Sequence, residues 1–187
     1  MKKQQSGFTL IELVIVIIVL GILSATAVPK FINLRDDAEI SRVKALGAAY
    51  QQAVSFINIR WNMLGVKGGY VNMPGFGDGT VDVSDTGYPI GTNKGNSSGF
   101  MSQPRNIGKG NQACVNLWDS LLETPPSVSL TDDGSDFQAY RRGSNGSNLS
   151  ECHYIFRVLG DTATTIENAK VSIKYDSITG KVTTTIQ

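Results

Sequence analysis

The chain contains little of the chemistry on which enzymes and metal centres depend. Its 187 residues include one histidine and two cysteines, and no HExxH, CxxC, GxGxxG or P-loop sequence occurs. The 17 basic and 16 acidic side chains give a formal net charge of +1, which provides no basic footprint for nucleic acid. We therefore predict no catalytic residue, no cofactor and no metal site, and we do not expect nucleic acid as a partner.

Small groups of charged residues in the second half of the chain leave some binding chemistry open. Two sets of loop aspartates could offer oxygens to Ca²⁺, but neither follows the spacing of an EF-hand, and turn formation is the favoured explanation. Arg141 and Arg142 form a small basic spot, for which a solvated loop is the favoured interpretation. The two aspartate sets are Asp78, Asp82 and Asp85, and Asp132, Asp133 and Asp136.

One long apolar run lies near the N-terminus. Residues 8–28 contain a single charge, Glu12, and at about 1.5 Å per residue a run of about 20 residues can cross a membrane as a helix. Lys2 and Lys3 precede the run, so the positive-inside rule keeps the N-terminus in the cytoplasm. The chain beyond Lys30 is then expected to lie outside the cytoplasm. Cleavage of an ordinary secretory signal after this run would leave Glu12 unexplained.

A short basic leader precedes the run. The leader reads Lys2-Lys3-Gln4-Gln5-Ser6-Gly7, and it is followed by Phe8-Thr9-Leu10-Ile11-Glu12. This pattern resembles the leader and mature start of type IV prepilins, which the pseudopilins of type II secretion share. The resemblance implies cleavage between Gly7 and Phe8 by a prepilin peptidase of the inner membrane, followed by N-methylation of Phe8.

Glu12 is the most informative residue of the run, because a carboxylate at bilayer depth is costly and needs a partner. Cleavage would leave a free amine on Phe8, four residues away. When such helices stack side by side, Glu12 of one subunit can meet the amine of a neighbour. The pair would fix the register, since a misplaced charge stays unpaired. The resemblance gives Glu12 this role in subunit assembly. A carboxylate that merely reaches the membrane surface is the alternative.

The two cysteines both lie beyond the membrane run. Oxidation is permitted outside the cytoplasm, so we predict a disulfide between Cys114 and Cys152. The residues are 38 positions apart, and closing a loop of that size contributes about 3 to 4 kcal/mol by the chain-entropy argument. A Cys/His pair can form a thiol nucleophile, but Cys152 and His153 are adjacent and would point to opposite faces of a strand.

The helix is expected to continue beyond the membrane run to about Leu64. Apolar residues there recur at steps of three or four, which is the spacing of one helix face. We expect Trp61 and Phe56 in the core, and Gly68-Gly69 makes further continuation unfavourable. The stripe consists of Val43, Leu46, Tyr50, Ala53, Ile57, Trp61 and Leu64.

Two helix-weakening residues, Gly21 and Pro29, lie in the membrane half. Glycine lowers helix stability by roughly 1 kcal/mol against alanine, and proline removes a backbone donor and kinks or ends a helix. The resemblance to pilins implies that the stretch between them loosens when subunits pack into a filament. A static kink at the membrane surface is the other interpretation.

The remaining chain predicts a small sheet domain. Residues 65–112 are loop-rich, with a short strand at 80–83. A short helix is expected at 114–122, with Trp118 in the core and Pro125-Pro126 after its end. Strands are expected at 154–159, 170–175 and 181–186, with a turn at 176–180. One antiparallel sheet packed on the helix stripe would cover both apolar faces.

The second half of the chain carries a further resemblance. Its pattern is similar to minor pilins of the mannose-sensitive haemagglutinin (MSHA) pilus. In many major pilins the disulfide-bounded segment lies near the C-terminus, whereas 35 residues follow Cys152 here. The quoted pattern is Thr80-Val81-Asp82-Val83, Gly87-Tyr88-Pro89-Ile90-Gly91, Cys114, Leu117-Trp118, Leu121-Leu122, Pro125-Pro126 and Cys152-His153-Tyr154.

Together these patterns predict an α+β prepilin with a long N-terminal helix packed on an antiparallel β-sheet. Residues 1–7 would be the leader, 8–29 the transmembrane and filament-core helix, and 30–187 the globular domain. The expected function is that of a minor type IV pilus subunit in surface attachment. A type II secretion pseudopilin and a membrane-anchored binding protein that never polymerises, an adhesin or DNA-uptake receptor, are the alternatives.

The resemblance also implies where the protein resides and which proteins it meets. The expected partners are other pilin subunits, the prepilin peptidase and methyltransferase, and the inner-membrane platform for pilus assembly. The chain would cross the inner membrane once before assembly and would then reside in a pilus on the cell surface.

Overall fold

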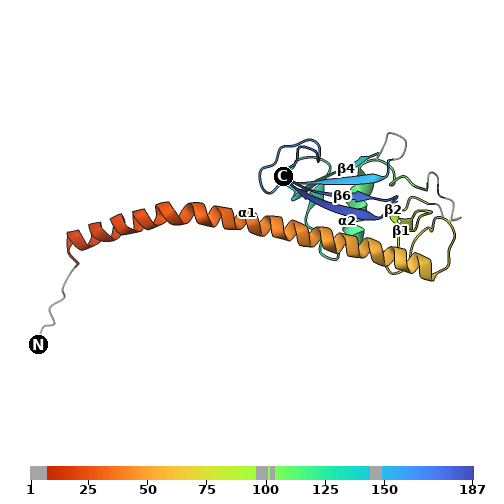
Figure 1. Cartoon of the computed structure of the whole chain (residues 1–187), viewed down its shortest axis with the longest axis horizontal. Helices are drawn as coiled ribbons and strands as arrows, with labels where there is room; N and C mark the ends of the chain where they lie inside the picture. The colour runs from red at the N-terminus through yellow and green to blue at the C-terminus, as the bar shows by residue number, and fades with distance from the viewer. Residues whose placement is uncertain (1–7, 96–100, 102–103, 144–148) are drawn as a thin grey trace, which may run out of the picture. The chain divides into compact units, whose positions relative to one another are not determined.

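The computed structural model describes residues 8–95, 101, 104–143 and 149–187 of the chain (Figure 1). The chain divides into two compact units, Met1–Glu39 and Ile40–Gln187, and helix α1 contributes residues to both. The predicted α+β class with a long N-terminal helix is confirmed. The elements are α1 (Leu10–Met63), β1 (Val81–Val83), β2 (Pro89–Thr92), α2 (Gln112–Leu121), β3 (Val128–Ser129), β4 (Phe137–Arg142), β5 (Glu151–Phe156), β6 (Val171–Asp176) and β7 (Lys181–Ile186).

In the N-terminal unit, the first part of α1, Leu10–Val28, is apolar on all its faces apart from Glu12. Leu10–Val28 is long and apolar enough to cross a membrane, and none of this stretch is buried within the protein. A helix that is apolar all round needs a lipid or protein environment to cover it. The helix continues through Gly21 and Pro29 without ending, so proline does not end it here. Loosening between these two residues during assembly stays a prediction.

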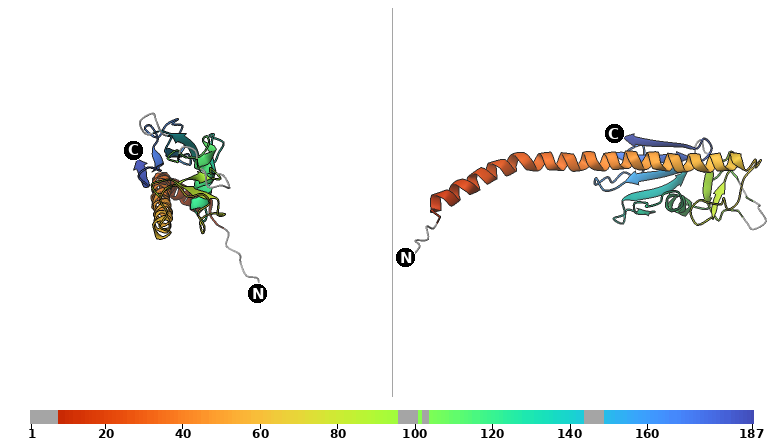
Figure 2. Two further views of the ribbon diagram at one scale, coloured as in Figure 1. Left: turned by 90° about the vertical axis from the view of Figure 1, so that its right-hand side faces the viewer. Right: turned by 90° about the horizontal axis from the view of Figure 1, so that it is seen from below.

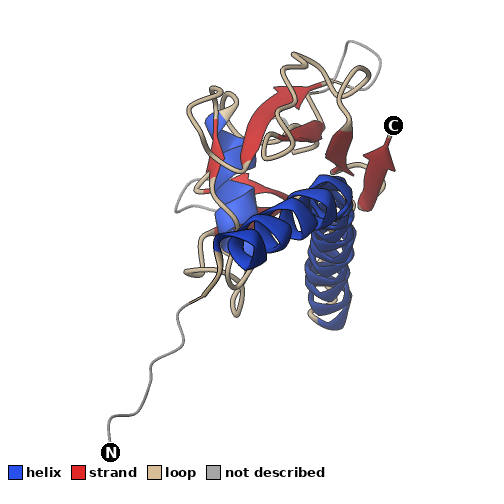
Figure 3. Ribbon diagram, turned by 90° about the vertical axis from the view of Figure 1, so that its left-hand side faces the viewer, coloured by secondary structure: helices blue, strands red, loops and turns tan. Residues whose placement is uncertain are grey.

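In the C-terminal unit, the last part of α1 presents one apolar face to the sheet and to α2. Val43, Tyr50, Val54 and Ile57 are fully buried there. Figures 1 and 2 show the strands lying alongside this part of α1, and Figure 3 shows α2 on the same side of the sheet as α1. The alternation of apolar side chains along β5 and β6 supplies the opposing face of this core.

The core is built around aromatic rings from three elements. The ring of Trp118 on α2 lies 4.6 Å from that of Tyr154 on β5 and 5.8 Å from that of Tyr50 on α1, measured between centroids. The hydroxyls of Tyr50 and Tyr154 are 3.2 Å apart, and Tyr154 donates to the Cys114 carbonyl at 2.9 Å. Every buried polar tip of these rings thus has a partner, as a tight core requires.

Strands β3 to β7 form one sheet in sequence order. The β3–β4 pair is parallel, and the pairs β4–β5, β5–β6 and β6–β7 are antiparallel. A separate antiparallel pair joins β1 and β2. The predicted turn at 176–180 connects β6 to β7, and the predicted strand 181–186 coincides with β7.

Four expectations about this unit need correction. Phe56 is 51% exposed rather than in the core, whereas Val54 is fully buried. Strand β5 begins at Glu151 and ends at Phe156, three residues earlier than expected at each end. Strand β2 lies within the stretch expected to be loop, and β4 contains Arg141 and Arg142, which were expected in a solvated loop.

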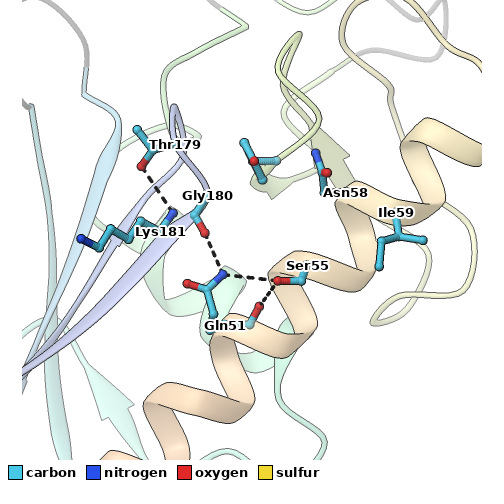
Figure 4. A pocket seen from close by; sticks show the side chains of 8 residues that line it. Gln51, Ser55, Asn58, Ile59, Thr179, Gly180 and Lys181 are labelled. Carbon is cyan, nitrogen blue, oxygen red and sulfur yellow. Dashed lines mark hydrogen bonds between the residues drawn. The ribbon is translucent and has the colours of Figure 1, made fainter.

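Helix α1 also holds the last strand, β7, through one side chain (Figure 4). The Gln51 amide nitrogen donates to the Gly180 carbonyl at 2.9 Å, and its oxygen accepts the Val182 backbone N–H at 2.7 Å. A hollow of about 360 Å³ opens beside this contact. The Gln51 amide thus forms the kind of hydrogen bonds that the backbone of a neighbouring strand would form, and it joins α1 to the start of β7.

Asp82 on β1 organises the loops around the smaller strand pair. Its buried carboxylate accepts backbone N–H groups from Asn72 at 2.8 Å, Lys94 at 2.5 Å and Gly95 at 2.8 Å. Asp82 was expected to be a turn-forming loop residue, but it is the middle residue of β1, and all three residues of β1 are buried. Three hydrogen bonds to one carboxylate compensate for its burial.

We expect Asp82→Asn to loosen these loops and to lower the free energy of unfolding by about 1 to 3 kcal/mol. The asparagine would place an NH₂ group against a backbone donor, which leaves a buried polar group unsatisfied. Hydrogen exchange at the amides of Asn72 and Gly95 measures the effect. Asp85→Asn is the matched control, because its ion pair with Arg105 is partly exposed and solvent-screened. Equal exchange in both variants would exclude this role for Asp82.

Candidate functional site

The start of α1 holds the carboxylate that the sequence singles out. Thr9 precedes the first helical residue, Leu10, and Glu12 lies in the first turn. One oxygen of Glu12, Oε2, accepts the Thr9 backbone N–H at 2.8 Å and the Thr9 hydroxyl at 2.7 Å. The Glu12 backbone N–H in turn donates to the Thr9 hydroxyl at 3.3 Å. This reciprocal pair is a capping box.

The capping box fixes the carboxylate beside an apolar surface. A hollow of about 260 Å³ is lined by Phe8, Glu12, Leu13 and Val16. Among the described residues, only Thr9 donates to the carboxylate, and it does so through Oε2, which leaves Oε1 able to accept further hydrogen bonds. The arrangement can therefore receive a cation without giving up its helix cap.

Glu12 was predicted from the sequence as a site residue, but its partner within the chain, Thr9, was not. Thr9-Leu10-Ile11-Glu12 has the Thr-x-x-Glu spacing that marks a helix start before an apolar run, and this signal was available. The helix consequently begins at Leu10 and not at Phe8. The polar groups of Thr9 and Glu12 at the helix start bind each other, so Glu12 also has a structural role within the single chain.

The remaining predicted site residues of the N-terminal unit are spread along α1. Gly7 lies outside the described residues, and the side chain of Phe8 is 92% exposed. Gly21 and Pro29 are internal residues of α1, more than two turns apart from Glu12. Among the predicted site residues of this unit that the structure describes, Phe8 and Glu12 line the same hollow, and Gly21 and Pro29 do not.

The predicted disulfide between Cys114 and Cys152 is present. It joins α2 to β5 with a Cα–Cα distance of 5.5 Å, and both residues are fully buried. It lies directly behind the aromatic core, because the Cys114 carbonyl accepts the Tyr154 hydroxyl. The bridge therefore ties the short helix to the central strand of the sheet.

His153 lies on the other face of β5, as the alternation of a strand predicts. Its Nε2 is 2.9 Å from a Glu151 oxygen and its Nδ1 is 3.1 Å from the Tyr140 hydroxyl. Lys174 donates to the second Glu151 oxygen at 3.3 Å. Burial lowers the pKa of His153, and the neighbouring carboxylate opposes this shift. These residues form a covered polar network that holds three strands together.

The aspartate sets have structural partners in the loops. Asp78 accepts the Thr80 hydroxyl and backbone N–H, and Asp136 accepts the Ser127 backbone N–H at 3.2 Å. Within the described residues no group of three or more histidine, cysteine or acidic side chains is arranged to hold a metal ion. Turn formation therefore accounts for Asp78, whereas Asp82 and Asp136 bind backbone groups of distant loop residues.

Comparison with known proteins gives matches that cover parts of the chain. Residues 2–28 match the family described as the prokaryotic N-terminal methylation motif. These findings support a type IV prepilin. The matched segment includes Gly7, Phe8, Glu12 and Gly21, whereas Pro29 follows it directly.

Three relatives illustrate the range of prepilin-like proteins. The type IV narrow pilus major component PilA5 of Thermus thermophilus is 48% identical over 54 residues, which is 29% of this chain and 47% of PilA5. Type II secretion system core protein G of Pseudomonas aeruginosa is 44% identical over 52 residues, 26% of this chain and 37% of that protein. The type IV major fimbrial protein FimA of Dichelobacter nodosus is 51% identical over 43 residues, 23% of this chain and 28% of FimA.

The chain thus spans less than half the length of each of these relatives. Their names describe pilus, fimbrial and secretion components and not enzymes. No solved structure gives a significant match to this chain. The comparisons therefore indicate only a general class of protein. The globular unit is known from the structure of this chain alone.

Proposed function

We propose that this prepilin is a minor subunit of a type IV pilus, which polymerises through α1 and serves in surface attachment. The observation that carries the proposal is the start of α1, where a carboxylate with an available oxygen lies on an apolar helix that the protein itself leaves uncovered. A stack of identical helices would cover this surface. The Phe8 amine of one subunit would bind Glu12 of the next and set their register.

The assignment to a minor subunit rests on the globular unit. The disulfide closes on the central strand β5, and two further strands follow it. Major pilins often carry their disulfide-bounded segment near the C-terminus, and the sequence pattern of this unit is similar to minor pilins of the MSHA pilus. Attachment is proposed because the loops of such a unit would face outward from a filament whose core is α1.

The route to the filament follows from the N-terminal segment. We propose that the chain is inserted once into the inner membrane with its N-terminus in the cytoplasm, and that a prepilin peptidase cleaves it after Gly7 and methylates Phe8. The assembly platform of the inner membrane would then add it to other pilin subunits. The basic leader and the apolar Leu10–Val28 stretch support this order.

A type II secretion pseudopilin is the second candidate function. The match to core protein G at 44% identity is similar in extent to the pilin matches and favours no single system. The genes beside this one separate the two candidates. A retraction ATPase would indicate a pilus, and an outer-membrane secretion gate would indicate type II secretion.

We expect the protein in filaments sheared from the cell surface, with Phe8 as its first residue and a methyl group on the Phe8 nitrogen. Mass spectrometry of the N-terminal peptide from filaments and from membranes measures both properties. A mature chain that begins at any other residue would contradict the prepilin interpretation. A correctly processed chain that is found only in membranes would contradict polymerisation.

Gly7 provides the matched test of processing. Gly7→Ala should largely preserve cleavage, whereas Gly7→Trp and Gly7→Glu should block it, because the peptidase must approach the backbone closely at this position. The uncleaved chain should remain in membranes and be absent from filaments. Cleavage that is insensitive to the size of residue 7 would place the processing site elsewhere.

A further inference from the structure

The single histidine of the chain, His153, lies on the face of β5 that points away from α1, and its side chain is only 2% exposed. Its Nδ1 is 3.1 Å from the hydroxyl of Tyr140 on β4, and its Nε2 is 2.9 Å from a carboxylate oxygen of Glu151. The Tyr140 ring stands edge-on to the imidazole, with 5.0 Å between the ring centroids. Both ring nitrogens therefore have a partner within the sheet.

The Tyr140 hydroxyl also binds the connection between β5 and β6, which comprises residues 157–170. The Ile166 backbone N–H donates to the phenol oxygen at 2.8 Å. A phenol has one hydrogen of its own to donate, and its oxygen can accept at the same time. While the oxygen accepts from Ile166, the phenol hydrogen can be donated to His153 Nδ1. The hydroxyl thus links the imidazole to the middle of the connection.

The partners of His153 determine which of its nitrogens carries the hydrogen at neutral pH. The Glu151 carboxylate accepts from the Lys174 ammonium at 3.3 Å through one oxygen and faces Nε2 with the other, so Nε2 carries the hydrogen. Nδ1 then has none and accepts the Tyr140 hydroxyl. A proton added to Nδ1 would face the phenol hydrogen, and one of the two would have to turn away. This group of hydrogen bonds therefore requires a neutral His153.

We propose that His153 and Tyr140 form an acid-sensitive latch, which holds residues 162–168 against the sheet while His153 is neutral and releases them when Nδ1 is protonated. On protonation the phenol hydrogen loses its acceptor. The phenol then has to turn or move, and its bond to the Ile166 N–H weakens. The proposal is independent of the assembly function of α1.

Two further contacts join this segment to the sheet, and both are exposed to solvent. Glu167 pairs with Arg142 at 3.1 Å, but the two side chains are 58% and 51% exposed, so water and salt screen the pair. The Gln187 side chain donates to the Glu167 carbonyl at 2.9 Å. The bond from Ile166 to Tyr140 is partly buried and is the most shielded of these three contacts. Its loss should therefore be felt at the middle of the segment.

The groups around His153 determine the pH at which the latch responds. Burial is the largest influence and lowers the pKa of His153 below its ordinary value of 6.5, whereas neighbouring carboxylates oppose the shift and Lys174 adds to it. The folded protein thus binds this proton less readily than the unfolded chain. The contribution of His153 to stability is complete above about pH 6.5 and falls as the pH decreases from there toward the folded pKa. The groups that face the imidazole or the phenol are Glu151 on β5, Tyr140 and Arg142 on β4, Lys174 on β6 and Glu167 on the connection.

The position of the hydrogen can be measured directly, because every imidazole signal of this chain belongs to His153. We use the full chain, labelled with ¹⁵N-histidine, in an uncharged detergent. Nitrogen NMR should show a hydrogen on Nε2 and none on Nδ1 at about pH 7.5, and protonation of Nδ1 below about pH 6.5. A hydrogen on Nδ1 at neutral pH would overturn the proposal, because the phenol would then have no acceptor there.

Hydrogen exchange at the Ile166 amide measures the latch itself. We expect its protection to fall about fivefold as His153 takes up a proton, which corresponds to the loss of one hydrogen bond. The Val182 amide is the reference, because it donates to the neutral side chain of Gln51 at 2.7 Å and should keep its protection. Constant protection of Ile166 across the His153 titration, or an equal loss at Val182, would refute the latch.

Two variants separate the latch from a general sensitivity to acid. His153→Asn places an oxygen near the position of Nδ1 and cannot take up a proton, so Ile166 should be equally protected at about pH 7.5 and about pH 5. Tyr140→Phe removes the acceptor of the Ile166 N–H, so protection should be about fivefold lower at both pH values. A loss of protection in His153→Asn as large as in the unmodified protein would exclude the latch. If His153→Asn does not fold, the tautomer and the exchange of the unmodified protein decide.

Discussion

If the proposed function is correct, replacing Glu12 by valine should reduce the incorporation of this protein into filaments by at least about tenfold, while leaving its membrane insertion intact or improved. The substitution removes the charge within the apolar stretch, which favours insertion. It also leaves the Phe8 amine of a packed neighbour without a partner in an apolar environment, which strongly opposes assembly. The ratio of protein in sheared filaments to protein in membranes measures the effect.

Two further variants separate pairing from helix capping. Glu12→Gln should be intermediate, because it keeps a hydrogen-bonding oxygen without the charge. Thr9→Ala removes the hydroxyl that caps the helix but keeps the carboxylate, so it should lower incorporation far less than Glu12→Val. If Thr9→Ala and Glu12→Val are equally defective, Glu12 acts through the helix start. Normal incorporation of Glu12→Val would exclude any registering role.

Loss of the disulfide should destabilise the globular unit by about 2 to 5 kcal/mol. We expect this loss in Cys152→Ser and in the double variant with Cys114→Ser. The bridge constrains the unfolded chain, and both sulfurs are packed in the core. Unfolding of the full chain in detergent by urea measures the change. In the unmodified protein, both cysteines should resist thiol labelling unless a reductant is added.

The single and double variants control for each other. If the loss comes from the missing bridge, Cys152→Ser and the double variant should be similarly unstable, and reduction of the unmodified protein should reproduce them. Rapid labelling of both thiols in the native, unreduced protein would refute the bridge. It would also reopen the possibility that Cys152 and His153 have reactive chemistry.

Local sequence patterns predicted the elements whose pattern lies entirely within their own residues. Helix α1 follows from an apolar run and a stripe at helical spacing, and β6 with β7 follows from alternation around a turn. Phe56 was placed in the core wrongly because Ala53 has apolar neighbours both three and four residues later. Choosing between Phe56 and Ile57 depends on where the sheet lies, and a single helix does not contain that information.

Other errors arose where distant segments supply the partners. Arg141 and Arg142 belong to β4 because their backbones pair with Cys152 and Glu151 of β5. Asp82 is buried because two loops bring it three backbone donors. The sequence of each strand by itself does not indicate these contacts with distant segments. In the candidate site, Glu12 was predictable from its isolation, and the Thr9 cap was predictable from its spacing, although it was overlooked.

The contact between Gln51 and β7 affects which backbone groups the sheet exposes at its border. A terminal strand exposes unpaired backbone groups, and such groups recruit strands from other copies into disordered aggregates. On β7, Gln51 occupies Val182 and Gly180, and Gly47 brings α1 so close to Thr184 that even a Cβ would collide. At the opposite border, β3 is only two residues long. Gln51 and the close approach of α1 thus cover part of the β7 border, and the short β3 offers few unpaired backbone groups at the other border, so the strands of another chain find little backbone to pair with there.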